Sequence, residues 1–158
     1  MADPASPFAD DHYPPRPAIR IFLDTSALIA GMASSRLPAP QVLRLGEAGV
    51  IRVYLSEQVL TEADRVWHAR FPALTAEFRN FLRNLDPVLV DDPTRAEVAS
   101  IEGWINADEA PILAAAIMSR ADCLVTWNTK YFQNRKVTEN VQFQVFTPTE
   151  FLEKYFGK

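Results

Sequence analysis

The feature that most constrains the fold of this chain is a set of short apolar runs without polar alternation. Segments of helical periodicity separate these runs. The runs IRIFL (19–23) and CLVT (123–126) read as strands that are buried on both faces, as in a parallel sheet covered by helices. SEQVLTEADRVWHAR (56–70) places apolar residues at helical spacing, and the helix predicted over 108–120 is apolar on nearly all sides. The alternation predicts an α/β fold with a parallel sheet covered on both faces.

The same patterns predict the remaining elements, with 127–136 taken as one loop. They are strands at 50–55, 87–91 and 141–147, helices at 25–32, 38–49, 73–85 and 148–156, and weak helical character over 94–105. Ligands of open parallel sheets bind beyond the carboxyl ends of the strands, where the strand order reverses. Polar residues directly after strands are therefore the first candidates for a functional site.

The length of 158 residues predicts one domain. We expect residues 1–18 to form a flexible tail because they are rich in proline and acidic residues, and residues 19–158 to form the single domain. The net charge is −4, from 16 Lys and Arg against 20 Asp and Glu. This balance argues against a protein whose whole surface is a basic nucleic-acid platform, although it leaves room for a local basic patch.

The sequence gives no sign of a membrane or secretory protein. No run approaches the roughly 20 apolar residues of a membrane helix, and the first 18 residues lack the basic and apolar regions of a signal peptide. Cys123 is the one cysteine, so no internal disulfide can form. We expect a cytoplasmic protein without a membrane partner.

Several familiar kinds of site are excluded. The chain has only 5 Gly and none are clustered, so a glycine-rich phosphate loop is absent. His12 lies in the tail and His68 on the polar face of a predicted helix, which does not make a zinc site or a serine hydrolase. Carboxylates are the chemical groups that remain.

Asp24 stands where the buried strand 19–23 ends, and Thr25 and Ser26 follow it. All three residue types are good helix N-caps, each worth about 1 kcal/mol. A helix cap, a metal ligand and a nucleophile are therefore all open as roles for Asp24.

Glu62 is the second candidate acid. It lies at the edge of the apolar stripe of the helix 56–70, where it could equally be a solvated residue paired with Arg65. Asp64 lies on the opposite flank, and helical geometry alone does not choose between the two acids.

Asp108 and Glu109 open the next buried helix, and Asn128 follows the strand CLVT. Capping and the helix dipole explain acids at a helix start, and Asn is a common turn residue. Clustered carboxylates repel one another without a cation, and oxygen-only ligands favour Mg²⁺ or Mn²⁺. Metal-assisted hydrolysis of a phosphodiester is the reaction that fits such a set.

The ordered segments IFLDTSALIAG, LSEQVLTEADRVW, DEAPILAAAIMSRADCLVTWNTKYF and VFTPTEFL resemble a PIN domain, and most closely the bacterial branch with VapC-like toxins. The resemblance covers roughly residues 19–156. It implies a three-layer αβα sandwich with a four- or five-stranded parallel sheet. It also implies an acidic pocket that binds Mg²⁺ or Mn²⁺ and cleaves single-stranded RNA.

By position in this resemblance, Asp24 is a direct metal ligand and Ser26 supports it. Glu62 matches the acid on the helix after the second strand, which favours it over Asp64. Glu109 matches the third acid because it directly precedes APILAAA, and Asp108 stays open as the ligand because it is the shorter residue and the better N-cap.

Thr126 is expected to support the site, and Asn128, two residues later, stands where the family often has Asp. The amide costs one negative charge and weakens any second metal site, but it can still hold a water or a phosphate. We therefore expect activity to survive. Trp127 and Tyr131 are candidates for stacking on bases. Candidate phosphate contacts are the basic residues Arg65, Lys130, Arg135 and Lys136.

Three functions are open at this stage. The first is a Mg²⁺- or Mn²⁺-dependent endoribonuclease acting on single-stranded RNA, with an antitoxin protein as a partner if it is the toxin of a type II pair. The second is a non-catalytic PIN-fold module that binds RNA or protein. The third, an enzyme with Asp24 as a phosphoryl-accepting nucleophile, lacks the second aspartate because Ser26 takes its place. A homodimer through the helices 56–70 and 73–85 is also open.

Overall fold

The computed structural model describes residues 18–33 and 39–157 of the 158-residue chain. The predicted tail, except for Ala18, lies outside the described residues. Among the helices of the described part, none is both long and apolar enough to cross a membrane.

The described residues form one five-stranded, all-parallel sheet with the strand order β3-β2-β1-β4-β5. The strands are β1 (Ile19–Leu23), β2 (Ile51–Ser56), β3 (Val88–Val90), β4 (Cys123–Val125) and β5 (Gln144–Phe146). β1 is central, since Ile21 is in register with Val53 on one side and with Cys123 on the other. The parallel sheet predicted from the apolar runs is confirmed.

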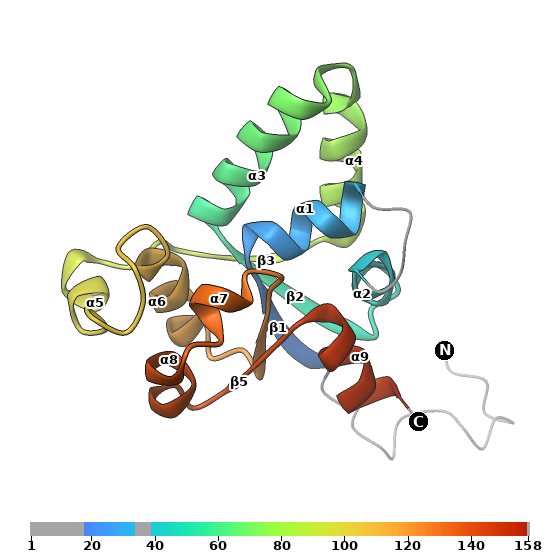
Figure 1. Cartoon of the computed structure of the whole chain (residues 1–158). Coiled ribbons are helices and arrows are strands. Elements are labelled where there is room, and N and C mark those ends of the chain that lie inside the picture. Colours follow the sequence, from blue (N-terminus) through green and yellow to red (C-terminus); the bar gives the residue numbers. More distant parts are fainter. Residues whose placement is uncertain (1–17, 34–38, 158) are drawn as a thin grey trace, which may run out of the picture.

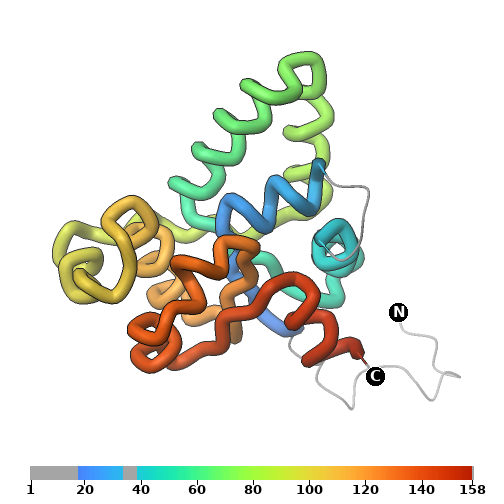
Figure 2. The backbone as a smooth tube through the Cα atoms, in the orientation of Figure 1, coloured from blue at the N-terminus to red at the C-terminus, as the bar shows by residue number. Residues whose placement is uncertain are grey.

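Helices cover both faces of this sheet (Figure 1). On one side lie α1 (Thr25–Ala33), α2 (Ala39–Glu47), α3 (Glu57–Arg70), α4 (Thr75–Leu85) and α9 (Pro148–Phe156). On the other side lie α5 (Arg95–Ala99), α6 (Ala110–Ser119), α7 (Thr129–Phe132) and α8 (Arg135–Asn140). α2 packs against α1, α4 and α9, and α3 and α4 form a hairpin that projects beyond the sheet (Figure 2). The arrangement confirms the three-layer αβα sandwich.

The central strand and the buried helix explain where the core sits. Ile21, Phe22 and Leu23 of β1 are fully buried, as are Ala115 and Ala116 of α6. Small side chains let a helix approach a sheet closely, and each fully buried large apolar side chain stabilises the fold by about 1.5–3 kcal/mol. β1 is thereby a rigid mount for the residue that follows it.

Helix ends follow the local chemistry in most places. Ser56 is the N-cap of α3, as predicted, and its hydroxyl accepts a hydrogen bond from the Val59 N–H.

The prediction of a single loop over 127–136 is wrong, because the segment contains α7 and the start of α8. These helices are too short for a helical period to show in the sequence.

The strand order reverses between β1 and β4. The chain leaves β1 toward β2, whereas it leaves β4 toward β5, on the opposite side of the sheet. Asp24 directly follows β1 and Thr126 directly follows β4. Both residues therefore stand at the position where α/β sheets bind their ligands.

Candidate active site

Asp24 is buried at this edge, with 2% of its surface exposed. Its Oδ1 accepts hydrogen bonds from the Ser26 hydroxyl (2.8 Å) and the Ala27 N–H (2.9 Å), and its Oδ2 accepts one from the Thr126 hydroxyl (2.5 Å). Burial raises the pKa of Asp24, and these three hydrogen bonds oppose the rise. The hydrogen bond from the Ala27 N–H caps α1. Because a carboxylate has about four acceptor positions, Oδ2 can accept a further hydrogen bond or bind a cation.

Ser26 and Thr126 connect the ends of the two central strands. Thr126 is fully buried, and its hydroxyl also accepts a hydrogen bond from the Asn128 N–H (2.8 Å). The Ser26 hydroxyl accepts one from the Trp127 N–H (3.1 Å) and lies 3.4 Å from the Thr126 hydroxyl. Both residues therefore fix the orientation of the Asp24 carboxylate.

Glu62 lies on α3 with its carboxylate toward the start of α1. Its Oε2 accepts a hydrogen bond from the Thr25 hydroxyl (3.2 Å), and its Oε1 accepts one from the Gln58 amide (3.0 Å). The alternative pairing with Arg65 is not formed, since the ion pairs in the described part of the chain lie elsewhere. We did not predict the contacts of Thr25 and Gln58, although Gln58 stands four residues before Glu62, the spacing of helical neighbours.

Glu109 is half-buried at the N-cap position of α6, and Asp108 is exposed one residue before it. Capping of this helix is the alternative to a ligand role for these two acids. The Glu109 side chain forms no capping hydrogen bond, and the Glu109 N–H itself donates to the Asn106 side chain (3.1 Å). The Glu109 carboxylate is therefore available for another role.

Electrostatics connect these acids across three separate segments of the chain. Burial, followed in order of size by the negative charges of Asp24, Glu62 and Asp108, raises the pKa of Glu109 to about 7. Such mutual repulsion is what clustered carboxylates show when no cation neutralises them.

The donor set fits a hard divalent cation, although it is not a closed cage. All its ligating atoms are oxygens, the kind that Mg²⁺ and Mn²⁺ prefer. Among the described residues, no three His, Cys, Asp or Glu side chains converge closely enough to enclose a metal ion. Mg²⁺ commonly takes only one or two carboxylates and keeps several waters, so it does not need such a cage.

Asn128 is half-buried at the N-cap position of α7. Its carbonyl accepts the first hydrogen bonds of that short helix, from the N–H groups of Tyr131 and Phe132. Its side-chain amide does not cap the helix. The amide is therefore available beside Thr126, at the edge where Asp24 lies.

The predicted phosphate contacts are more dispersed than the acids. Arg65 is exposed on α3, and the Lys130 ammonium lies 5.7 Å from the centre of the Tyr131 ring. Arg135 forms an ion pair with Glu139 (3.0 Å) and, with Lys136, lines a shallow cavity on the α8 side of the sheet. No hydrogen bond or ion pair between described residues joins these four cations to the acids.

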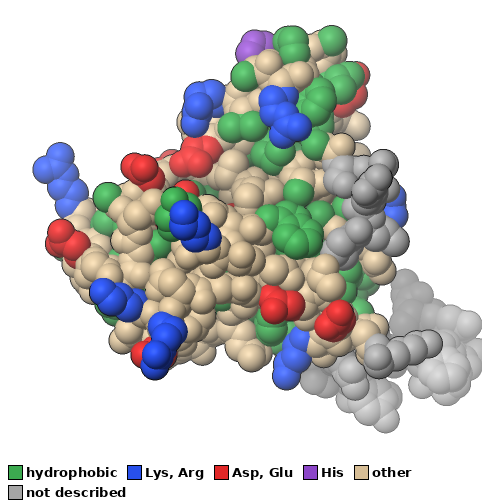
Figure 3. Space-filling view, viewed as in Figure 1, with side chains coloured by type: hydrophobic (Ala, Val, Ile, Leu, Met, Phe, Trp, Pro, Cys, Tyr) green, Lys and Arg blue, Asp and Glu red, His purple; other side chains and the backbone are tan. Residues whose placement is uncertain are grey.

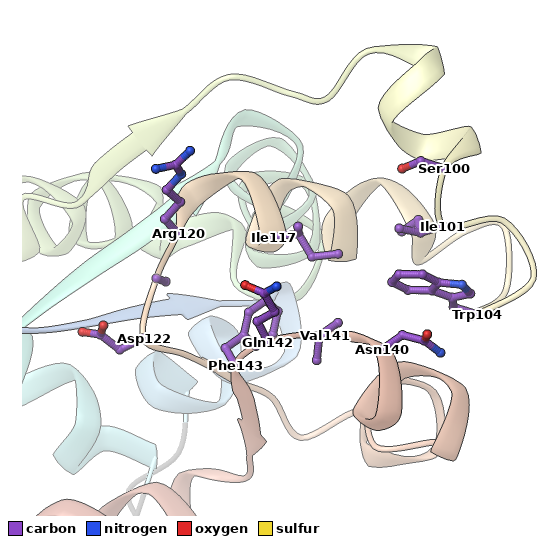
Figure 4. Close-up of a pocket in the computed structure, with 11 residues that line it drawn as sticks. Ser100, Ile101, Trp104, Ile117, Arg120, Asp122, Asn140, Val141, Gln142 and Phe143 are labelled. Carbon is purple, nitrogen blue, oxygen red and sulfur yellow. The ribbon is translucent and has the colours of Figure 1, made fainter.

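A separate cavity of about 720 Å³ lies at the opposite edge, beside the loop that enters β4 (Figure 4). Trp104, Ile117, Arg120 and Phe143 are among its lining residues. Figure 4 shows Trp104 and Asn140 close together at one end and Arg120 at the other. None of the predicted site residues lines it, so the acids mark the candidate site.

Comparisons with known proteins bear on the family and the fold of the chain. The family model described as "PIN domain" matches residues 20–130, a span that includes Asp24, Glu62, Glu109 and Asn128. Among solved structures, PAE2754 from Pyrobaculum aerophilum is similar, with a TM-score of 0.54 and 16% sequence identity over 83% of this chain and 91% of that one. At this identity the likeness concerns the fold alone. No curated protein sequence matches the chain.

Proposed function

The chain belongs to the PIN domain family, whose members are generally nucleases, and we propose that it is a Mg²⁺- or Mn²⁺-dependent endoribonuclease for single-stranded RNA. The observation that carries the proposal is the electrostatic coupling of Glu109 to Asp24 and Glu62. These acids come from distant parts of the sequence, and capping of single helices does not explain why they approach one another.

In this proposal, Asp24, Glu62 and Glu109 hold the cation, with Asp108 as the alternative to Glu109. The bound metal would lower the pKa of a water and offset negative charge on the scissile phosphate. Ser26 and Thr126 keep the Asp24 carboxylate in one orientation, and Thr25 and Gln58 do the same for Glu62. Such support holds charged ligands in place without reorganisation during the reaction.

Asn128 would bind a water or a phosphate oxygen rather than a second cation, because its amide is neutral. Arg65, Lys130, Arg135 and Lys136 would contact phosphates farther along the strand, since they lie outside the acid cluster. The role of a toxin, with an antitoxin protein as partner, extends the proposal. It predicts that induction of the wild-type protein arrests bacterial growth and that Asp24→Asn relieves the arrest.

Cleavage of a fluorogenic single-stranded RNA tests the proposed chemistry. We expect activity with Mn²⁺ or Mg²⁺, none in EDTA, and losses on the order of 100-fold or more for Asp24→Asn, Glu62→Gln and Glu109→Gln, as for loss of one charge-stabilising group. Asp64→Asn is the matched control, because Asp64 is on α3 but makes no hydrogen bond to the site. Equal activity of wild type and Asp24→Asn would refute the proposal.

A second candidate is a non-catalytic module that binds RNA or a protein partner. Asn128 in place of an acid and the open arrangement of the carboxylates favour it. It predicts no Mn²⁺ binding in calorimetry, together with measurable affinity for RNA. Tight Mn²⁺ binding that Glu62→Ala abolishes would exclude it.

A further inference from the structure

A groove of about 620 Å³ lies between α1 and α3, and two of its lining residues, Thr25 and Ser26, hydrogen-bond to Glu62 and Asp24. Thr25 and Ser26 line its inner end, Ile29 and Val66 lie along it, and Arg70 lines its outer end. The α3 residues Glu62, Val66 and Arg70 are spaced four apart and so form one row along the helix. Figure 3 shows hydrophobic side chains gathered over α1, with basic side chains beside the outer part of α3.

The width of the groove follows from small residues on α1. Ala30 and Ala33 line it together with Ile29, and alanine fills little of the space between two helices. The groove is therefore apolar along its length and polar at both ends.

Trp127 forms a wall of the groove next to the acids. Its side chain lines the groove, and the residue is 39% exposed, whereas Trp67 is only 6% exposed. The backbone N–H of Trp127 donates to the Ser26 hydroxyl, which donates to Asp24. The backbone that carries this accessible indole ring is thus linked through Ser26 to the central carboxylate, and an exposed aromatic ring at this place suits a base beside a reacting phosphate.

Arg70 places a positive charge at the other end. It is exposed at the last position of α3, and its guanidinium lies 5.3 Å from the centre of the Phe71 ring. In the described part of the chain it forms no ion pair. Arg70 follows Glu62 by eight residues, about 12 Å along a helix, so it is suited to a phosphate beyond the scissile one.

Charge distinguishes this groove from the cavity on the other side of the acids. The described residues that line that cavity, of about 780 Å³, include two acids, Asp92 and Glu102, and one cation, Arg95. Among the described residues that line the α1–α3 groove, Arg70 is the one with a charged side chain. The phosphates of a nucleic acid are therefore attracted to the α1–α3 side and repelled from the other.

We propose that the α1–α3 groove binds single-stranded RNA on one side of the scissile phosphate, with a base stacked on Trp127 and a more distant phosphate paired with Arg70. This inference rests on the proposed nuclease function. It adds the path that the bound RNA strand follows away from the acids. The apolar floor formed by Ile29 and Val66 suits the faces of bases rather than the sugar–phosphate backbone.

Fluorescence anisotropy with a short fluorescein-labelled oligouridylate, measured in EDTA to prevent cleavage, tests this assignment. We expect Trp127→Ala to raise Kd roughly 5- to 150-fold, the range for loss of one base–aromatic stack. Trp127→Phe keeps an aromatic face and should retain most of the affinity. Arg70→Ala should reduce the slope of log Kd against log salt by about 0.7, the value for one phosphate contact of a single strand, and Arg70→Lys should restore it.

Arg79→Ala is the matched control for charge, because Arg79 is exposed on α4 and does not line the groove. Thermal unfolding of each variant shows whether it is folded. If wild type cleaves RNA but Trp127→Ala and Arg70→Ala bind as wild type does, the groove assignment is wrong and the nuclease function stands. If wild type does not cleave but both variants lose affinity, the nuclease function is wrong and the groove assignment stands. Loss of a dimer in sedimentation by Trp127→Ala, without any effect on RNA binding, would assign the groove to a second copy and overturn the inference.

Discussion

Glu109→Gln should make the metal-free protein more stable while it abolishes cleavage. The folded protein raises the pKa of Glu109 from 4.5 to about 7, chiefly by burial and then by the charges of Asp24 and Glu62. An acid whose pKa is raised on folding holds its proton more tightly in the folded state than in the unfolded chain. Its effect on stability is therefore neutral below about pH 4.5, becomes increasingly unfavourable between about pH 4.5 and 7, and is complete above about pH 7. Glutamine keeps the shape of the side chain and removes the charge.

The size of the effect follows from the two pKa values. The difference between about 7 and 4.5, at about 1.36 kcal/mol per pKa unit, gives an upper bound of about 3.4 kcal/mol. Glu109 is only half-buried, and solvent screens such charges, so we expect a gain of about 1–2 kcal/mol in the free energy of unfolding at about pH 8. At about pH 4 the gain should be close to zero.

Urea unfolding in EDTA at these two pH values measures both quantities. Glu153→Gln is the control, because Glu153 is exposed on α9 and away from the acids; its effect should be small and independent of pH. Addition of Mn²⁺ should stabilise wild type but not Glu109→Gln, since ligands that bind only the folded state raise its stability. A variant that is no more stable than wild type at about pH 8 would refute the electrostatic coupling of the acids.

Three further changes test single contacts of the site. Thr126→Val removes the hydroxyl that donates to Asp24 and should lower the free energy of unfolding by about 1–3 kcal/mol in urea denaturation, because it leaves a buried acceptor without its partner; Thr126→Ser should restore most of it. Asn128→Asp adds a negative charge at the edge of the sheet and should raise the Mn²⁺ affinity measured by calorimetry, and an unchanged affinity would separate this position from the metal. Ser56→Ala removes the N-cap of α3 and should cost about 1 kcal/mol of stability with no change in the cleavage rate, as measured by thermal unfolding and by the RNA assay.

The layered fold was predictable because its signals are local. Apolar runs without alternation can be stable strands only when both of their faces are covered, so β1 and β4 predicted the parallel sheet. Of the segment 94–105, for which weak helical character is predicted, only α5 is helical and the rest forms mostly turns. The sequence patterns do not predict α7 and α8. In α8 the cap is the Asn134 side chain, which accepts a hydrogen bond from the Val137 N–H. A single cap before a six-residue helix is hard to distinguish from a turn.

The position of Asp24 was equally predictable, whereas the surroundings of Glu62 were not. Asp24 is set by the end of a strand, a feature that the sequence displays directly. The side chain of Glu62 is set by Thr25, which lies 37 residues earlier in the chain. Helical geometry left Glu62 and Asp64 equivalent, and the resemblance to PIN domains favoured Glu62. A contact between two helices that are far apart in the sequence depends on how both helices pack on the sheet. The periodicity within one helix carries no information about that packing.

The energetics of the site separate a functional role of Asp24 from a purely helix-capping role more clearly than any single residue does. One exposed acid would cap α1 adequately, since a cap needs only an oxygen that accepts from the first N–H groups. The fold instead buries Asp24, supplies it with hydrogen bonds from Ser26, Ala27 and Thr126, and brings Glu109 close enough for the two charges to oppose each other. This opposition lowers the stability of the metal-free protein. A site that lowers stability is expected where charge serves binding or catalysis, and a divalent cation would turn the same repulsion into attraction.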